Sequence, residues 1–127
     1  MDFNTDEVDV AIRFGGGNYP ELVVDRMFQD AILPLASPSF IEKFGGSLKE
    51  SDLSKVNLLH DDSSSFLLGA AGWADWLSRA GVTGVDATRG SRFSHADHSL
   101  DAAIDGGGVV LGRLILAMKD ISAGRLI

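Results

Sequence analysis

The hydrophobic pattern of the chain predicts a series of short strands. Apolar or β-branched runs occupy residues 8–14, 22–24, 31–35, 56–60 and 109–111, and a last run begins at residue 125. Residues 89–93, between two helical stripes, are predicted as a further strand although only Phe93 is apolar. Proline has no N–H to donate to a neighbouring strand. Pro34 therefore predicts that the run 31–35 lies at a sheet edge or in a crossover.

Apolar residues at helical spacing lie between these runs. A first helix is predicted to begin at Ser37-Pro38, because serine can cap a helix and proline fits its first position. Further apolar stripes predict helices over 73–80, 96–104 and 114–121, and glycine follows each of them. Ser94 and Asp97 have the spacing of a capping box at the start of the helix over 96–104.

The order of these elements decides the fold class. Strands that alternate with helices are typical of an α/β fold with a mixed, mostly parallel sheet flanked by helices. The first run has no obvious partner, and the last one, at 125–127, has only begun when the sequence stops. We therefore expect the sequence to be part of a longer protein.

Composition and charge exclude several classes of protein. The net charge of −7 argues against wrapping a phosphate backbone, because nucleic-acid modules carry a basic face. The absence of cysteine excludes a disulfide framework, a thiolate metal site and a cysteine nucleophile. No apolar run approaches the roughly 18 residues of a membrane span, and the acidic start is unlike a signal peptide. We expect a cytoplasmic protein without a membrane partner.

Two groups of polar residues are candidates for ligand contact. Ser94 and His95 stand where a strand leads into a helix, and ligands of open α/β sheets gather beside such helix starts. Asp61 and Asp62 follow a buried strand and can line the same cleft. Each group also has a commoner structural role: a serine cap with a solvated histidine in the first, turn formation by aspartate in the second.

Other candidate chemistry is weaker. His95, Asp97 and His98 invite a metal interpretation, but histidines at a helix start are more often solvated, so we predict no metal and no cofactor. Arg13 ends a strand and can bind a carboxylate ligand or pair with a neighbouring aspartate. The glycine triplets lack the spacing of a phosphate loop. No G-x-S-x-G motif supports a hydrolase, and the tryptophan stripe of 73–80 is typical of a core.

Six segments, in order along the chain, resemble LysR-type transcriptional regulators. They are DVAIRFG at 9–15, LASPSF at 35–40, LLHDD at 58–62, WADWL at 73–77, AIDGGGVVLGR at 103–113 and GRL at 124–126. Each match alone is weak, but their common order is specific. Within the family, they are most similar to the subgroup that resembles the glycine-cleavage activator.

The resemblance implies an effector-binding domain with the type 2 periplasmic-binding-protein fold. Such domains have two α/β lobes that hold a small molecule between them. It implies that residues 1–29 are a remnant of the first lobe and its crossover. Residues 30–127 would be the second lobe, incomplete at its C-terminus. The family's helix-turn-helix has no counterpart in this chain, so DNA would be bound only through another domain.

The resemblance also implies function and site residues. The chain would sense a small polar or anionic effector rather than catalyse a reaction, and would act as a homo-oligomer, a dimer or a tetramer. The family positions that match are Ser94, His95, Asp97, Asp61 and Asp62 in the second lobe and Arg13 on the first-lobe side. A transporter's solute-binding protein has the same fold and is the first alternative. An α/β hydrolase or lyase is the second.

Overall fold

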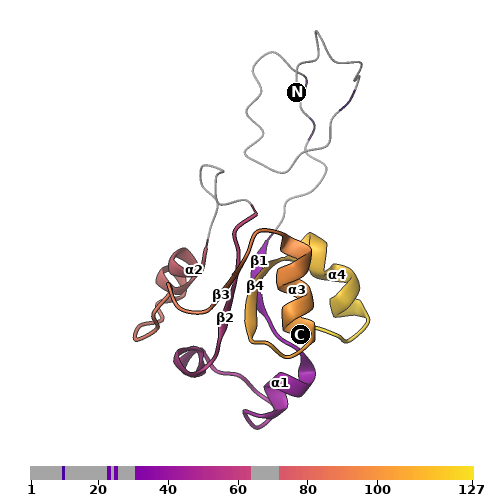
Figure 1. Cartoon of the computed structure of the whole chain (residues 1–127). Helices are drawn as coiled ribbons and strands as arrows, with labels where there is room; N and C mark the ends of the chain where they lie inside the picture. Colours follow the sequence, from indigo (N-terminus) through magenta and orange to yellow (C-terminus); the bar gives the residue numbers. More distant parts are fainter. Residues whose placement is uncertain (1–9, 11–22, 24, 26–30, 64–71) are drawn as a thin grey trace.

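The computed structural model describes residues 10, 23, 25, 31–63 and 72–127 (Figure 1). Of the predicted strands at 8–14 and 22–24 only residues 10 and 23 are described, and Arg13 lies outside the described residues. The elements, in chain order, are β1 (Ile32–Leu35), α1 (Pro38–Glu42), the 3-10 helix η1 (Glu50–Lys55), β2 (Leu58–Asp61), α2 (Trp73–Ala80), β3 (Ser91–Phe93), α3 (Ala96–Ile104), β4 (Val109–Arg113) and α4 (Leu114–Ser122). The predicted alternation of strands and helices is confirmed over this part of the chain.

The four strands form one sheet in the order β1-β4-β2-β3. β4, β2 and β3 run parallel, and β1 runs antiparallel to β4. The sheet is therefore mixed and mostly parallel, as predicted. The parallel strands end at one edge of the sheet, so the residues that follow them lie near one another.

Pro34 lies in the edge strand β1, which confirms the prediction made from its missing donor. Along β1, alternate residues direct their backbone groups to opposite sides. Ala31 accepts a hydrogen bond from Leu114, just after β4, whereas Ala36 exchanges two bonds of 3.0 and 3.1 Å with Ile127. Pro34 has the parity of Ala36, so its nitrogen points away from β4. Of the strand predicted at 125–127, only this pairing of Ile127 with Ala36 is present.

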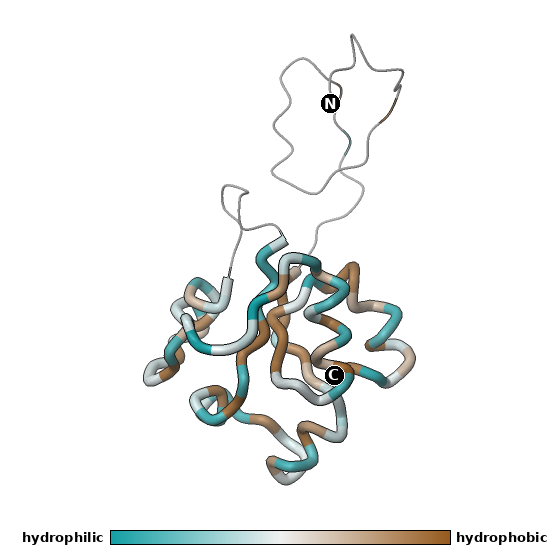
Figure 2. Tube along the Cα trace, viewed as in Figure 1, coloured by the Kyte–Doolittle hydropathy of each residue, from teal (hydrophilic) through white to brown (hydrophobic). Residues whose placement is uncertain are grey.

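The sheet separates two layers of helices (Figure 1). On one face, side chains from α1, η1 and α2 pack with Leu58, Val109 and Leu111. On the other face, α3 and α4 pack with Leu59 and Val110. Figure 2 shows continuous hydrophobic colour along β1 and most of β4, in the middle of the domain. Residues 73 and 77 of the predicted tryptophan stripe are buried, so the stripe serves the core.

Replacing Ser37 by alanine is expected to cost about 1 kcal/mol of unfolding free energy. The Ser37 hydroxyl oxygen accepts a hydrogen bond from the Phe40 N–H at 3.2 Å, and Ser37 is buried, so water cannot replace it well. Urea unfolding followed by circular dichroism measures the loss. Ser78→Ala, on the exposed side of α2, is the control and should cost nothing. Equal losses in both variants would contradict the capping role.

Candidate functional site

The carboxyl ends of β2 and β4 form the place where this topology admits a ligand. The two strands are parallel neighbours, but β2 leads toward α2 on one face of the sheet and β4 leads into α4 on the other. The connections that follow the two strands thus leave toward opposite faces of the sheet, and this opens a crevice at the carboxyl ends of the strands. Their paired register ends at Leu59 and Val110, although the strands continue to Asp61 and Arg113.

A pocket of about 260 Å³ lies beside this crevice, on the face covered by α2. Its described lining residues come from the end of β2, the start of α2, the segment before β3, and β3 and β4. They are His60, Asp61, Asp62, Gly72, Trp73, Ala74, Ala87, Thr88, Arg92 and Leu111. The volume is small compared with the several hundred Å³ of sites for drug-sized ligands, so it suits a small metabolite.

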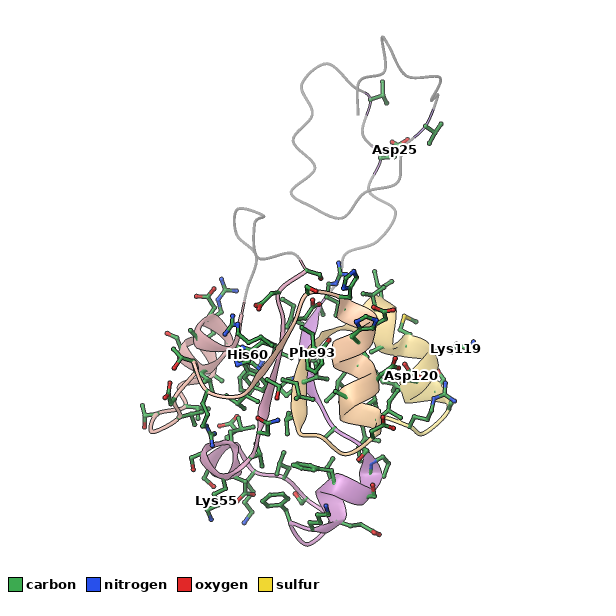
Figure 3. All side chains as sticks on the ribbon, in the orientation of Figure 1. Asp25, Lys55, His60, Phe93, Lys119 and Asp120 are labelled. Atoms are coloured by element: carbon green, nitrogen blue, oxygen red, sulfur yellow. The ribbon has the colours of Figure 1, made fainter. Side chains whose placement is uncertain are left out.

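His60 is the buried imidazole of this pocket, 6% exposed. Figure 3 shows it in the interior, whereas Lys55 and Lys119 lie on the outside. Its Nε2 atom lies 2.8 Å from the carbonyl oxygen of Arg89. Because a carbonyl only accepts, Nε2 carries the proton, and in the neutral ring Nδ1 is left as an acceptor. Trp73 donates its indole N–H to the Leu59 carbonyl at 2.9 Å and so ties α2 to β2.

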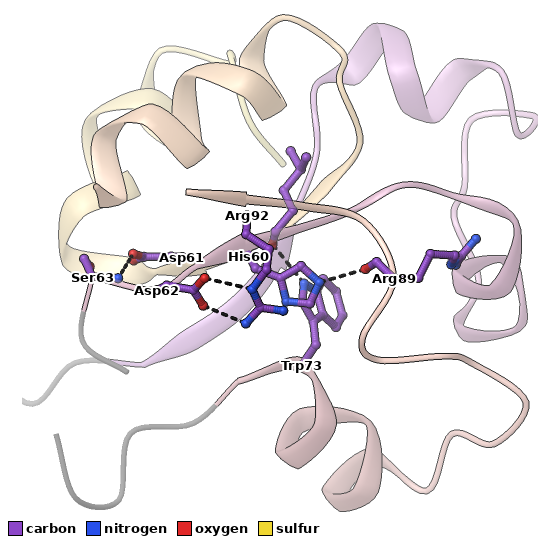
Figure 4. Close-up of polar contacts among 8 residues, drawn as sticks. His60, Asp61, Asp62, Ser63, Trp73, Arg89 and Arg92 are labelled. Carbon is purple, nitrogen blue, oxygen red and sulfur yellow. Dashed lines mark hydrogen bonds and ion pairs between the residues drawn. The ribbon is translucent and has the colours of Figure 1, made fainter. Parts of the chain in front are cut away.

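The two predicted aspartates have different roles (Figure 4). Asp61 accepts a hydrogen bond from the Ser63 N–H at 2.9 Å, which is the turn role expected of it. Asp62 instead receives two bonds of 2.8 Å from Nε and Nη2 of Arg92 on β3. The hydrogen bonds and the charge of Asp62 hold the pKa of Arg92 above its usual value.

Thr88 adds an oxygen acceptor to the pocket wall. Its hydroxyl and its backbone N–H both donate to one carboxylate oxygen of Asp86, at 2.6 and 3.0 Å. These hydrogen bonds lower the pKa of Asp86, so its carboxylate stays ionised and keeps the Thr88 hydroxyl proton directed toward it. The Thr88 oxygen can therefore only accept a further hydrogen bond.

Ser94, His95 and Asp97 follow the end of β3, whose Arg92 lines the pocket, but are not themselves among its lining residues. They lie close to the two aspartates, because Asp61 pairs with Phe93, the residue before Ser94, and the Asp62 N–H donates to the Phe93 carbonyl at 2.8 Å. The structure thus brings Asp61, Asp62 and Arg92 together and places Ser94 and His95 just beyond them, all exposed except the two half-buried aspartates.

The predicted capping box of Ser94 and Asp97 is wrong. α3 begins at Ala96, so the N-cap position falls on His95, which makes no side-chain capping bond. The Ser94 hydroxyl lies instead 3.1 Å from Nδ1 of His95. Asp97 is exposed in the first turn, where its charge favours the positive end of the helix. The backbone donors of this helix start are consequently not covered by a serine or aspartate cap.

The rings of His95 and His98 lie 5.0 Å apart, so the helical proximity behind the metal interpretation is real. Among residues 31–63 and 72–127, however, no group of three or more His, Asp or Glu is placed to hold a metal ion. The same segments contain no helix long and apolar enough to cross a membrane.

Four residues of this region were not identified as site candidates from the sequence: His60, Thr88, Arg92 and Arg113. Arg113 is half-buried at the carboxyl end of β4, across the crevice from β2. Its position directly after an apolar strand was a usable signal, as it was for Asp61. Thr88 and Arg92 are brought in by the sheet pairing of β3 with β2, for which the sequence has no local signal.

Comparisons with known proteins identify the family. The LysR substrate binding domain matches residues 2–127. The glycine cleavage system transcriptional activator of Escherichia coli (strain K12) is 36% identical over 122 residues, which are 96% of this chain and 38% of that protein. The corresponding homolog of Haemophilus influenzae is 32% identical over 94% of this chain. The chain thus spans less than half the length of these relatives.

The fold agrees with the sequence match. The effector domain of the transcriptional regulator AmpR of Pseudomonas aeruginosa superposes with a TM-score of 0.72 and 25% identity, covering all of this chain and 57% of that one. The regulatory domain of CrgA from Neisseria meningitidis has a TM-score of 0.55 at 20% identity and supports the fold alone. These domains have the periplasmic-binding-protein-like fold. The chain belongs to the LysR substrate-binding domain family.

Proposed function

We propose that this chain is the effector-sensing part of a LysR-type transcriptional regulator and binds a small polar or anionic metabolite. The main support is that polar side chains gather at the carboxyl ends of β2 and β3, beside the topological switch point, in a chain that matches the family over residues 2–127. The named relatives are transcriptional regulators, which favours this role over that of a transporter protein.

Two lobes would hold the effector. In this proposal residues 30–127 are one lobe and residues 1–29 belong to the other. The lobe formed by residues 30–127 contacts the effector through Asp61, Asp62, Ser94, His95 and Asp97. The other lobe contacts it through Arg13. The donors at the start of α3 suit an anionic group.

The proposed mechanism is binding linkage rather than catalysis. An effector that contacts both lobes stabilises one closure state, and this state biases how paired subunits in the cytoplasm present a separate DNA-binding domain. Such coupling amounts to about 1–3 kcal/mol. The partners are a second copy of the chain, the effector and, through that other domain, DNA.

A thermal-shift screen of the 127-residue chain with amino acids and small carboxylates tests the proposal. A ligand at about ten times its Kd stabilises by about 1.4 kcal/mol, which should raise the Tm by roughly 5 °C. Ser94→Ala and His95→Ala should reduce that rise at least about twofold, since each removes a polar group beside the start of α3. Ser122→Ala, at the exposed end of α4, is the control and should leave it unchanged.

Two results would contradict the proposal. One is a screen in which no ligand raises the Tm. The other is a rise that persists in full in both Ser94→Ala and His95→Ala, which would place the ligand elsewhere.

A further inference from the structure

The wall of the pocket beside β2 is close to neutral on the face of the sheet that α2 covers. Side chains alternate between the two faces along a strand, so His60 points to the α2 face, whereas Asp61 points with Leu59 to the face of α3 and α4. Among the described lining residues this leaves Asp62 and Arg92 as charged groups on the pocket side. Their two bonds of 2.8 Å join them into a pair (Figure 4).

Two hydrogen-bond acceptors line this neutral pocket. His60 is 6% exposed and its Nε2 donates to the Arg89 carbonyl, so Nδ1 of the neutral ring is left as an acceptor. Among the described residues, none donates to this Nδ1 atom. The Thr88 hydroxyl sends its proton to Asp86 at 2.6 Å, so its oxygen also accepts. A ligand group that reaches both residues must therefore supply donors.

The start of α2 supplies donors to the same pocket, which Gly72, Trp73 and Ala74 line. The first turn of a helix has N–H groups without intrahelical acceptors. Glycine, which has no side chain to cap with, occupies the N-cap of α2. The N–H groups of this turn also carry the positive end of the helix dipole. Donors and a buried acceptor, Nδ1 of His60, are thus combined in one small cavity.

The balance of donors and acceptors selects the ligand group. A carboxylate has only acceptors and would meet two more at His60 and Thr88. An ammonium has only donors, and the neutral wall does not balance its charge. A primary carboxamide is uncharged and has a carbonyl acceptor for the start of α2 and two N–H donors for His60 and Thr88. Trp73, Ala87 and Leu111 provide an apolar surface for a short hydrocarbon part.

We infer that this pocket binds the primary carboxamide group of a small metabolite, with His60 and Thr88 as the residues that select it over a carboxylate. The inference rests on the proposed effector-binding function and specifies the chemistry of one end of the effector. Arg92 lines the pocket near the end of β3. A polar or anionic group elsewhere in the same ligand would therefore lie beyond that end, toward Ser94.

Amide probes that differ in their number of N–H donors test the inference without changing the protein. The isotope-labelled 127-residue chain is titrated with propionamide, N-methylpropionamide, N,N-dimethylpropionamide and sodium propionate at equal ionic strength, and the backbone N–H signal of Ala74 is followed by NMR. Propionamide should shift this signal saturably. The N-methyl probe, which lacks one donor, should bind about fivefold more weakly, and the other two should give no saturable shift. The indole signal of Trp76, which lines a second cavity, should stay in place throughout.

A threonine variant locates the amide in the pocket. Thr88→Val removes one acceptor with little change of shape, so it should raise the Kd for propionamide about fivefold. Thr83→Val makes the same change at an exposed residue that is not among the described lining residues, and it should leave the Kd unchanged. Because Thr88→Val also releases Asp86, circular dichroism of both variants verifies that the fold is retained.

The inference and the proposed function can fail separately. A saturable Ala74 shift with propionate, or equal Kd values for propionamide and its N,N-dimethyl derivative, would overturn the carboxamide assignment. No shift with any probe, or equal effects of Thr88→Val and Thr83→Val, would overturn the pocket itself as the binding site. The proposed function would then still be decided by Ser94→Ala and His95→Ala in the thermal-shift screen.

Discussion

Gly108→Ala is expected to lower the unfolding free energy by at least about 2 kcal/mol. A Cβ at this position would collide with the carbonyl of Asn57, and its φ of +154° lies where L-residues rarely go. Overpacking against fixed backbone costs about 1–3 kcal/mol, and a strained backbone a further 1–3 kcal/mol or so. The same carbonyl accepts the Val109 N–H at 3.0 Å, so the start of the β2–β4 pairing is disturbed as well.

Urea unfolding followed by far-UV circular dichroism measures this loss. Gly84→Ala is the matched control: its φ is +79° and an added Cβ would meet nothing within 4 Å. It should therefore cost only about 1 kcal/mol, the conformational term alone. A Gly108→Ala variant no less stable than Gly84→Ala would show that Asn57 does not constrain this turn.

Gly108 also shows which part of the fold was accessible from the sequence. The glycine triplet at 106–108 marked the end of a helix, and α3 does end there, with Gly106 at a φ of +82°. That signal is local, because a helix stop depends on the residues at the stop. The contact with Asn57 joins residues 51 positions apart, and no spacing within the triplet encodes it.

The strand order shows the same difference between signals carried by single residues and contacts between distant parts of the chain. Pro34 could be placed at a sheet edge because a missing N–H is a property of one residue. The alternation of strands and helices likewise predicted parallel pairing. The order β1-β4-β2-β3 was not predictable from periodicity, since it depends on which strands bury each other's apolar faces.

The candidate site was predicted in part for the same reason. Asp61 has the turn contact that its residue type and position predicted. Asp62 was assigned the same role and instead pairs with Arg92, 30 residues later, because β3 lies beside β2. The capping box of Ser94 failed by one residue: α3 starts at Ala96, and a shift of one position removes the geometry that the motif requires.

The second large effect is expected at Trp73, whose replacement by alanine should cost about 3–5 kcal/mol. The side chain is 1% exposed and packs between α2 and the sheet, and its ring and that of Trp76 meet edge to face with their centroids 5.7 Å apart. Trp73→Phe separates its two contributions. It keeps an aromatic ring but removes the indole N–H, so the buried Leu59 carbonyl loses a donor, at about 1–3 kcal/mol.

Trp73→Phe should also weaken ligand binding, and this links the core to the site. Leu59 immediately precedes His60 and Asp61, so the indole bond holds the end of β2 against α2 where the pocket opens. Trp73→Phe should therefore have a lower Tm without ligand. In addition, a ligand that raises the Tm of the wild-type chain should raise the Tm of this variant by less. Trp76→Phe, which alters a half-buried ring that makes no such bond to β2, is the control and should cost less than about 1.5 kcal/mol. Equal losses of stability and of ligand response in the two variants would mean that packing alone, and not the bond to Leu59, positions the end of β2.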